Sequence, residues 1–195
     1  MTDREKIRQG VIKALPEAQQ ITDTELREHV YDAWTMSLAE SGFSRIEDIP
    51  ASGNPGSPAM KTGTQADHLR SVTRIAMAIA KEFQNTFGEF EIDMDEIIAG
   101  GLCHDLGKSF EFDYQNQERW KSDPRITGWP SIRHSVYGVH IALSAGLPEK
   151  IAHIAGAHSK EGENIERGLA CTIIYYADHS YWRILAKAGV LDGTY

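Results

Sequence analysis

The sequence predicts an all-α protein. Two observations favour this fold class: long segments place apolar residues three and four positions apart, as amphipathic helices do, and no segment alternates apolar and polar residues at period two, as strands do. A third observation is that turn-forming residues are concentrated in one segment, with three prolines and three glycines within residues 50–63. The chain of 195 residues is long enough to bury a core as one domain.

The N-terminal part is expected to hold two helices and a loop. Residues 3–15 suit a short polar helix. A second helix is expected from Thr22, because Thr22 and Glu25 have the spacing of a capping box, to a stop at Gly42. Residues 50–63 then form a loop, which is either a plain connector or a lid over a site.

Two helices are expected in the middle of the chain. The first covers residues 64–87 and has one apolar face. The second starts at Asp93, runs into the string CHDLGK and breaks at Gly107. Residues 109–130 are rich in aromatic and polar side chains without a clear period, so we expect an irregular excursion there.

Three further helices are expected in the C-terminal part. The first covers residues 131–145. Pro148 suits the first turn of the next helix, which ends near His158. Residues 159–164 form a polar loop, and the last long helix covers residues 166–188.

Composition and charge exclude several classes of protein. The formal net charge of −8 leaves no basic footprint for nucleic acid or an anionic membrane at the whole-chain level. No apolar stretch is long enough to span a bilayer, and the charged N-terminus lacks the apolar region of a secretory signal. The two cysteines cannot form a disulfide framework, so we expect free thiols and a cytoplasmic protein.

Histidines and aspartates indicate a metal site. Seven of the eight histidines lie at or after His68, and imidazole is the commonest metal ligand. His104 and Asp105 end an apolar helix, and Asp178 lies within another apolar stretch. A buried carboxylate is costly unless it is paired or bound to a metal. Imidazoles and carboxylates without thiolates suit Fe, Mn, Zn, Co or Ni.

The order and flanks of these residues resemble the HD-domain superfamily of metal-dependent phosphohydrolases, in particular its H…HD…H…H…D members with two metals. The resemblance covers residues 64–188 and implies an all-α HD-domain helical bundle around a two-metal centre. It divides the chain into an N-terminal helical extension with the Gly/Pro-rich loop, residues 1–63, and an HD domain, residues 64–195. The six residues that carry it are His68, His104, Asp105, His134, His158 and Asp178.

The resemblance also implies two ligand sets that share Asp105. The first metal would be held by His68, His104, Asp105 and Asp178, and the second by Asp105, His134 and His158. The implied ions are two divalent transition metals, iron or manganese in the first place, with zinc, cobalt or nickel as alternatives. The implied activity is hydrolysis of a phosphoric ester by a hydroxide that bridges the two metals. The alternative is a di-iron oxygenase similar to myo-inositol oxygenase or the organophosphonate oxygenases, in which the same six ligands serve the cleavage of a C–C or C–P bond with O₂.

Basic residues near the ligands are candidates for substrate contacts. Lys108 lies three residues after Asp105, so one helical turn places both side chains on the same side of the site. Asp105 and Lys108 are the expected catalytic residues. Arg133 and Lys160 each adjoin a ligand histidine or lie close to one, and are further candidates for binding an anion. The expected partner is therefore a small anionic molecule, without nucleic acid or membrane. Residues 1–63 either cover the site or form a contact within a homo-oligomer.

Overall fold

The computed structural model describes residues 2–88 and 91–193, and its architecture confirms the all-α prediction. Within these ranges the regular structure is helical, apart from isolated bridges that join residues of the loop after the second helix to each other and to the C-terminal segment. The α-helices are α1 Asp3–Ala14, α2 Thr24–Ala39, α3 Gln65–Phe87, α4 Met94–Cys103, α5 Lys108–Glu111, α6 Tyr114–Ser122, α7 Pro124–Thr127, α8 His134–Ser144, α9 Glu149–Ala157 and α10 Leu169–Ala188. Short 3-10 helices cover Pro16–Gln20, Ile46–Asp48 and Lys160–Asn164. No helix in the described parts of the chain is long and apolar enough to cross a membrane.

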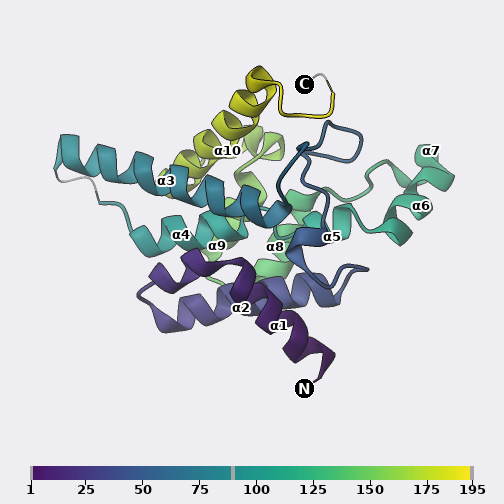
Figure 1. Ribbon diagram of the computed structural model, residues 1–195, viewed down its shortest axis with the longest axis horizontal. Helices are drawn as coiled ribbons and strands as arrows, with labels where there is room; N and C mark the ends of the chain where they lie inside the picture. The colour runs from purple at the N-terminus through teal and green to yellow at the C-terminus, as the bar shows by residue number, and fades with distance from the viewer. Residues whose placement is uncertain (1, 89–90, 194–195) are drawn as a thin grey trace.

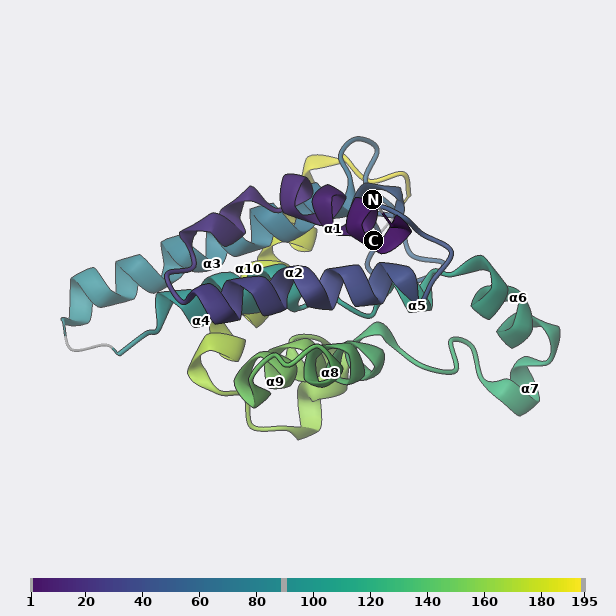
Figure 2. The same ribbon diagram turned by 90° about the horizontal axis from the view of Figure 1, so that it is seen from below.

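Helix α4 is the centre of the bundle. It packs against α2, α3, α9 and α10, and every residue from Ile97 to Cys103 is buried. A helix that is apolar on all sides is stable only when neighbours cover all of them. Figures 1 and 2 show α4 enclosed between α3 and the α8–α9 pair. The C-terminal end of α4, where His104 and Asp105 follow, therefore lies inside the protein.

The N-terminal helices share this core. The indole Nε1 of Trp34 on α2 donates a 2.8 Å hydrogen bond to the carbonyl of Leu102, and the Ser37 hydroxyl donates to the carbonyl of Leu106 at 2.6 Å. These two carbonyls flank the His104–Asp105 pair in sequence, so α2 supports the segment that carries it. The division of the chain after residue 63 stays a prediction.

The start of α2 differs from the capping prediction. The N-cap is Asp23, whose carboxylate accepts hydrogen bonds from the amides of Glu25 and Leu26. The hydroxyl and backbone amide of Thr22 instead donate to the Asp95 carboxylate near the start of α4. The sequence pattern located the start of the helix, but it did not indicate that the hydrogen-bond partner of Thr22 lies on a distant segment.

The prediction of an irregular segment over residues 109–130 is wrong, because α5, α6 and α7 lie there. Local signals explain them: Asp113 caps α6 by accepting from the amide of Asn116, and Pro124 occupies the first position of α7. Figures 1 and 2 show α6 and α7 projecting from the bundle. Such short, largely exposed helices do not need the apolar stripe on which the prediction relied.

Candidate metal centre

The six predicted ligands converge at one place inside the bundle. All are buried. They come from five helices or their ends: His68 from α3, His104 and Asp105 from the end of α4, His134 from the first position of α8, His158 from the end of α9 and Asp178 from the middle of α10. Because each element contributes one or two ligands, the site exists only in the folded bundle.

His68, His104 and Asp178 form a compact group able to hold a metal ion. The His68 Nε2 atom lies 3.2 Å from His104 Nε2 and 3.3 Å from Asp178 Oδ1. The distance from His104 Nε2 to the same aspartate oxygen is 3.9 Å. Three ligand atoms thus face one another across a space the size of a single ion.

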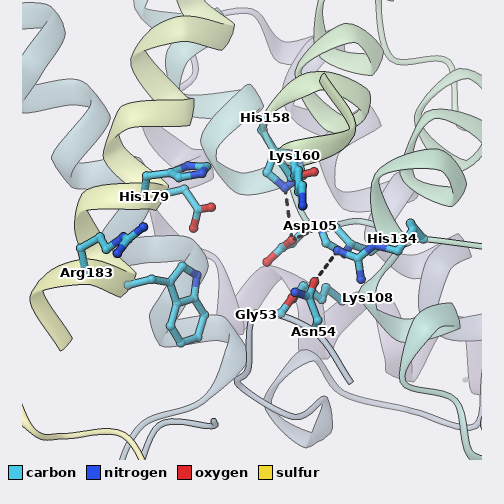
Figure 3. A pocket seen from close by; sticks show the side chains of 13 residues that line it. Gly53, Asn54, Asp105, Lys108, His134, His158, Lys160, His179 and Arg183 are labelled. Carbon is cyan, nitrogen blue, oxygen red and sulfur yellow. Dashed lines mark hydrogen bonds and ion pairs between the residues drawn. The ribbon is translucent and has the colours of Figure 1, made fainter. Parts of the chain in front are cut away.

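The carboxylate of Asp105 is divided between two pairs of imidazoles. Its Oδ2 atom lies 3.3 Å from His68 Nε2 and 3.5 Å from His104 Nε2. Its Oδ1 atom lies 3.5 Å from His134 Nε2 and 3.6 Å from His158 Nε2. His104, Asp105 and His158 make a second compact group, and His134 lies outside both compact groups while facing Asp105. Figure 3 shows Asp105 between His158 and His134.

Three of the histidines have a fixed orientation. Their Nδ1 atoms are hydrogen-bonded to oxygen: His104 to the carbonyl of Gly101 at 2.7 Å, His158 to that of Ala155 at 2.9 Å, and His134 to Glu111 Oε2 at 2.7 Å. Because an oxygen partner requires the proton on Nδ1 in the neutral ring, the lone pair is on Nε2. Each Nε2 therefore faces the Asp105 carboxylate in the form that binds a metal.

The environment sets the charges of these groups. Burial lowers the pKa of His104 to about 4, and it also lowers the pKa of His134, so both imidazoles are neutral at pH 7. Burial raises the pKa of Asp105, but Lys108 and the neighbouring histidines outweigh it and hold the pKa well below its usual value. Burial lowers the pKa of His158, but the Asp105 carboxylate outweighs it and the net shift is upward. The site thus presents an ionised carboxylate among imidazoles.

The residues fit a divalent metal. Buried polar atoms are normally hydrogen-bonded, and few exceptions are expected. Four buried side-chain atoms lack a partner in the described part of the chain: Gln65 Oε1, His68 Nδ1, Ser135 Oγ and Asp178 Oδ1. Two belong to predicted ligands, and the other two to residues close to them in sequence. Asp178 Oδ1 in particular is a buried carboxylate oxygen whose nearest polar neighbours are imidazoles, which suits a cation.

Glu111 links the metal centre to Arg133. One of its carboxylate oxygens accepts from His134 Nδ1, and the other accepts from the guanidinium of Arg133, which also donates to Glu161. Burial would raise the pKa of Glu161, but hydrogen bonds from Ser159 and Arg133 lower it to about 2. A carboxylate that accepts from a ligand histidine fixes its ring and increases its basicity. Glu111 therefore orients His134.

The glycine in the string CHDLGK has a steric role. A Cβ added at Gly107 would lie 2.0 Å from the carbonyl oxygen of His134 and 2.8 Å from the amide nitrogen of Gly138. Only a residue without a side chain lets α8 approach so closely. This contact places His134 beside the Asp105 carboxylate.

A pocket of about 250 Å³ opens onto the metal centre. Its walls include the predicted ligands Asp105, His134, His158 and Asp178. All three predicted substrate contacts also line it, namely Lys108, Arg133 and Lys160, together with Arg183, His179, Trp182, Ser159, Gly53 and Asn54 (Figure 3). Four cationic side chains around a site with two carboxylates favour an anionic ligand that contacts a metal.

The predicted substrate contacts already have partners within the protein. The Lys108 ammonium is buried, donates to the carbonyls of Ser52 and Gly53, and lies 5.3 Å from the centre of the Phe112 ring. The Arg133 guanidinium donates to the side chains of Glu111, Glu161 and Asn54. Lys160 is exposed at the rim.

Several site residues escaped the sequence analysis. Gln65 donates from Nε2 to Asp105 Oδ2 at 2.8 Å, and its position one turn before His68 was a usable signal. Glu111 lies one turn after Lys108, which was a weaker signal. Trp182 packs against His68 with ring centres 5.0 Å apart. Nothing local indicated Asn54, because its contact with Arg133 spans 79 residues of sequence.

The comparison with protein families agrees with this geometry. The model of the HD domain family matches residues 66–181, which is more than half of the chain. The chain therefore belongs to the HD-domain family, whose members bind divalent metals. No solved structure gives a significant match.

Two curated proteins of Methanocaldococcus jannaschii are similar in sequence. The chain is 27% identical over 170 residues to a dihydroneopterin 2',3'-cyclic phosphate phosphodiesterase, over 84% of this chain and 65% of that protein. It is 32% identical over 107 residues to an uncharacterized protein, over 53% of this chain and 52% of that protein. The chain thus spans somewhat less than two thirds of the first relative and about half of the second.

Proposed function

We propose that this protein is a metal-dependent phosphohydrolase that hydrolyses a phosphoric ester. The observation that carries the proposal is the division of the Asp105 carboxylate, with one oxygen facing His68 and His104 and the other facing His134 and His158. A carboxylate arranged in this way suits two neighbouring cations, and paired cations are common in enzymes of phosphate ester chemistry.

The proposed cofactors are two divalent transition-metal ions. The ligand sets are those of the sequence resemblance: His68, His104, Asp105 and Asp178 for one ion, and Asp105, His134 and His158 for the other. Iron or manganese come first, with zinc, cobalt and nickel as alternatives, since the donors are imidazoles and carboxylates. When bound, such ions activate water and neutralise the charge of a phosphate group.

The protein's own groups would position the substrate. Lys108 places a buried positive charge beside Asp105, and Arg133 and Lys160 supply further charge along the pocket. A small anionic ester fits both this charge and a pocket of about 250 Å³. The relative named as a cyclic phosphate phosphodiesterase makes cyclic phosphodiesters the first substrates to test.

The reaction class is tested by metal exchange. Apo-protein is loaded separately with Mn²⁺ and Fe²⁺ and screened against phosphate monoesters and cyclic diesters, with and without O₂. Anaerobic turnover by the Mn²⁺ form would support hydrolysis. Activity only with iron, together with consumption of O₂, would contradict it and indicate the oxygenase chemistry of the alternative.

The bridging role of Asp105 is tested by metal content. Asp105→Ala should lose most of both ions, because both ligand sets contain it, whereas His158→Ala should mainly lose one. Elemental analysis of the purified variants measures this directly, with circular dichroism as the control for folding. Full metal content in folded Asp105→Ala would refute the bridging assignment.

A further inference from the structure

Residues 51–60 form a small hairpin at the mouth of the pocket, which we call the pocket hairpin. An antiparallel bridge between Ser52 and Ala59 closes it, and the amide of Met60 donates to the carbonyl of Ala51 at 2.9 Å. The hydroxyl of Ser52 donates to the carbonyls of Asn54 and Ser57 and shapes the turn. The hairpin lies outside the part of the chain that matches the HD-domain family, residues 66–181.

The cations of the pocket hold one side of this hairpin. The Lys108 ammonium donates to the backbone carbonyls of Ser52 and Gly53, and the Arg133 guanidinium donates to Asn54 Oδ1. Gly53 and Asn54 thereby line the pocket (Figure 3). The same two cations that face the metal centre thus fix the position of Asn54.

The C-terminal segment holds the other side. The amide of Ala59 donates to the Asp192 carboxylate at 2.6 Å, and the amide of Asp192 donates to the carbonyl of Ala59 at 3.0 Å. Met60 forms a bridge with Leu191, and its sulfur accepts from the Tyr181 hydroxyl of α10. Figure 1 shows the C-terminal segment beside this loop. The hairpin therefore joins the wall that carries Lys108 and Arg133 to the helix that carries Asp178.

The contact with Arg133 fixes the orientation of the Asn54 amide. A guanidinium has only donors, so the atom of Asn54 that meets it must be the acceptor Oδ1. The two N–H donors on Nδ2 are thereby left for another acceptor. Anionic oxygens are strong acceptors, and hydrogen bonds to charged groups are stronger than those between neutral groups.

We propose that Asn54 is a substrate-binding residue, whose amide donates to an oxygen of the phosphate group while the pocket hairpin holds it at the pocket wall. This inference rests on the proposed function, since it requires a phosphate in the pocket. It gives residues 51–60 a role in binding the phosphate group that a plain connector would not have.

The test measures binding of inorganic phosphate to the full-length protein loaded with Mn²⁺, by isothermal titration calorimetry. Asn54→Ala should weaken phosphate binding by about tenfold, because one hydrogen bond to an anion is lost. Asn54→Asp should weaken it further, since it removes the donors and adds a negative charge next to Arg133. Ser57→Ala is the matched control: it lies in the same hairpin, and its side chain does not line the pocket.

Metal content and thermal stability are measured on the same samples. Wild-type affinity in both Asn54 variants, with full metal content, would overturn the inference and leave the phosphohydrolase proposal intact. Loss of metal in Asn54→Ala would also overturn it, because Asn54 would then support the metal centre and not the substrate. Wild-type protein that binds metal but no phosphate would contradict the phosphohydrolase proposal itself.

Discussion

Replacing Gln65 by leucine should weaken metal binding without weakening the fold. Gln65 is fully buried, its Nε2 donates to Asp105 Oδ2 at 2.8 Å, and its Oε1 has no partner in the described part of the chain. The bond holds the Asp105 carboxylate by the oxygen that faces His68 and His104. Leucine has a similar volume and removes the donor and the unpaired acceptor together.

The structure gives the magnitude and the sign of both effects. A buried hydrogen bond to a charged acceptor contributes about 1.5–3 kcal/mol, so its loss should reduce metal affinity by about ten- to a hundredfold. In the metal-free protein, removal of a buried unpaired acceptor offsets much of the lost hydrogen bond. The free energy of unfolding of the apo-protein should therefore change by no more than about 1 kcal/mol.

The assay is competition for Mn²⁺ or Zn²⁺ with a chromogenic chelator, combined with urea unfolding of the apo-protein. Gln84→Leu is the matched control, because Gln84 lies on the same helix α3 and donates to a backbone carbonyl far from the site. Unchanged metal affinity in Gln65→Leu would refute a positioning role. A parallel loss of apo-protein stability and metal affinity would show that Gln65 supports the fold only.

Three other changes test the surroundings of the site. Glu111→Gln should weaken metal binding by about ten- to a hundredfold, because His134 loses a charged acceptor. The control Glu118→Gln, on the exposed face of α6, should leave metal binding unchanged. Competition with a chelator measures the metal affinity of both variants. Gly107→Ala should destabilise the protein by about 1–3 kcal/mol in urea unfolding, since its Cβ would overlap a carbonyl of α8. The pKa of Glu161 is lowered to about 2, so the stability that its ionised form contributes is present above its usual pKa near 4.5 and is lost as the pH falls from there toward 2. In Glu161→Gln, the urea concentration at the unfolding midpoint should therefore fall less steeply over this pH range.

The sequence alone predicted the family, which the family match confirms, and it pointed to the histidines and aspartates that the fold brings together. Helical spacing and caps predicted the long helices, because those signals are local and repeat along each segment. The order of His68, His104–Asp105, His134, His158 and Asp178 indicated the family, and the family match and the buried cluster agree with it. The short helices α6 and α7 escaped because they are largely exposed and need no apolar stripe, and α5 escaped because it is a single turn whose buried residues are mostly polar.

Tertiary structure decided which atoms face one another. Only the packing of α3, α8 and α9 around the end of α4 gives the two oxygens of Asp105 different imidazole partners. The sequence spacing predicted that Lys108 lies on the same side of the site as Asp105. It did not predict that the Lys108 ammonium donates to backbone carbonyls of a loop more than fifty residues earlier in the sequence. Residue types and helical periodicity are local properties of the chain, so they can be recognised in the sequence. The partner of a buried charge depends instead on which distant segments the core brings together.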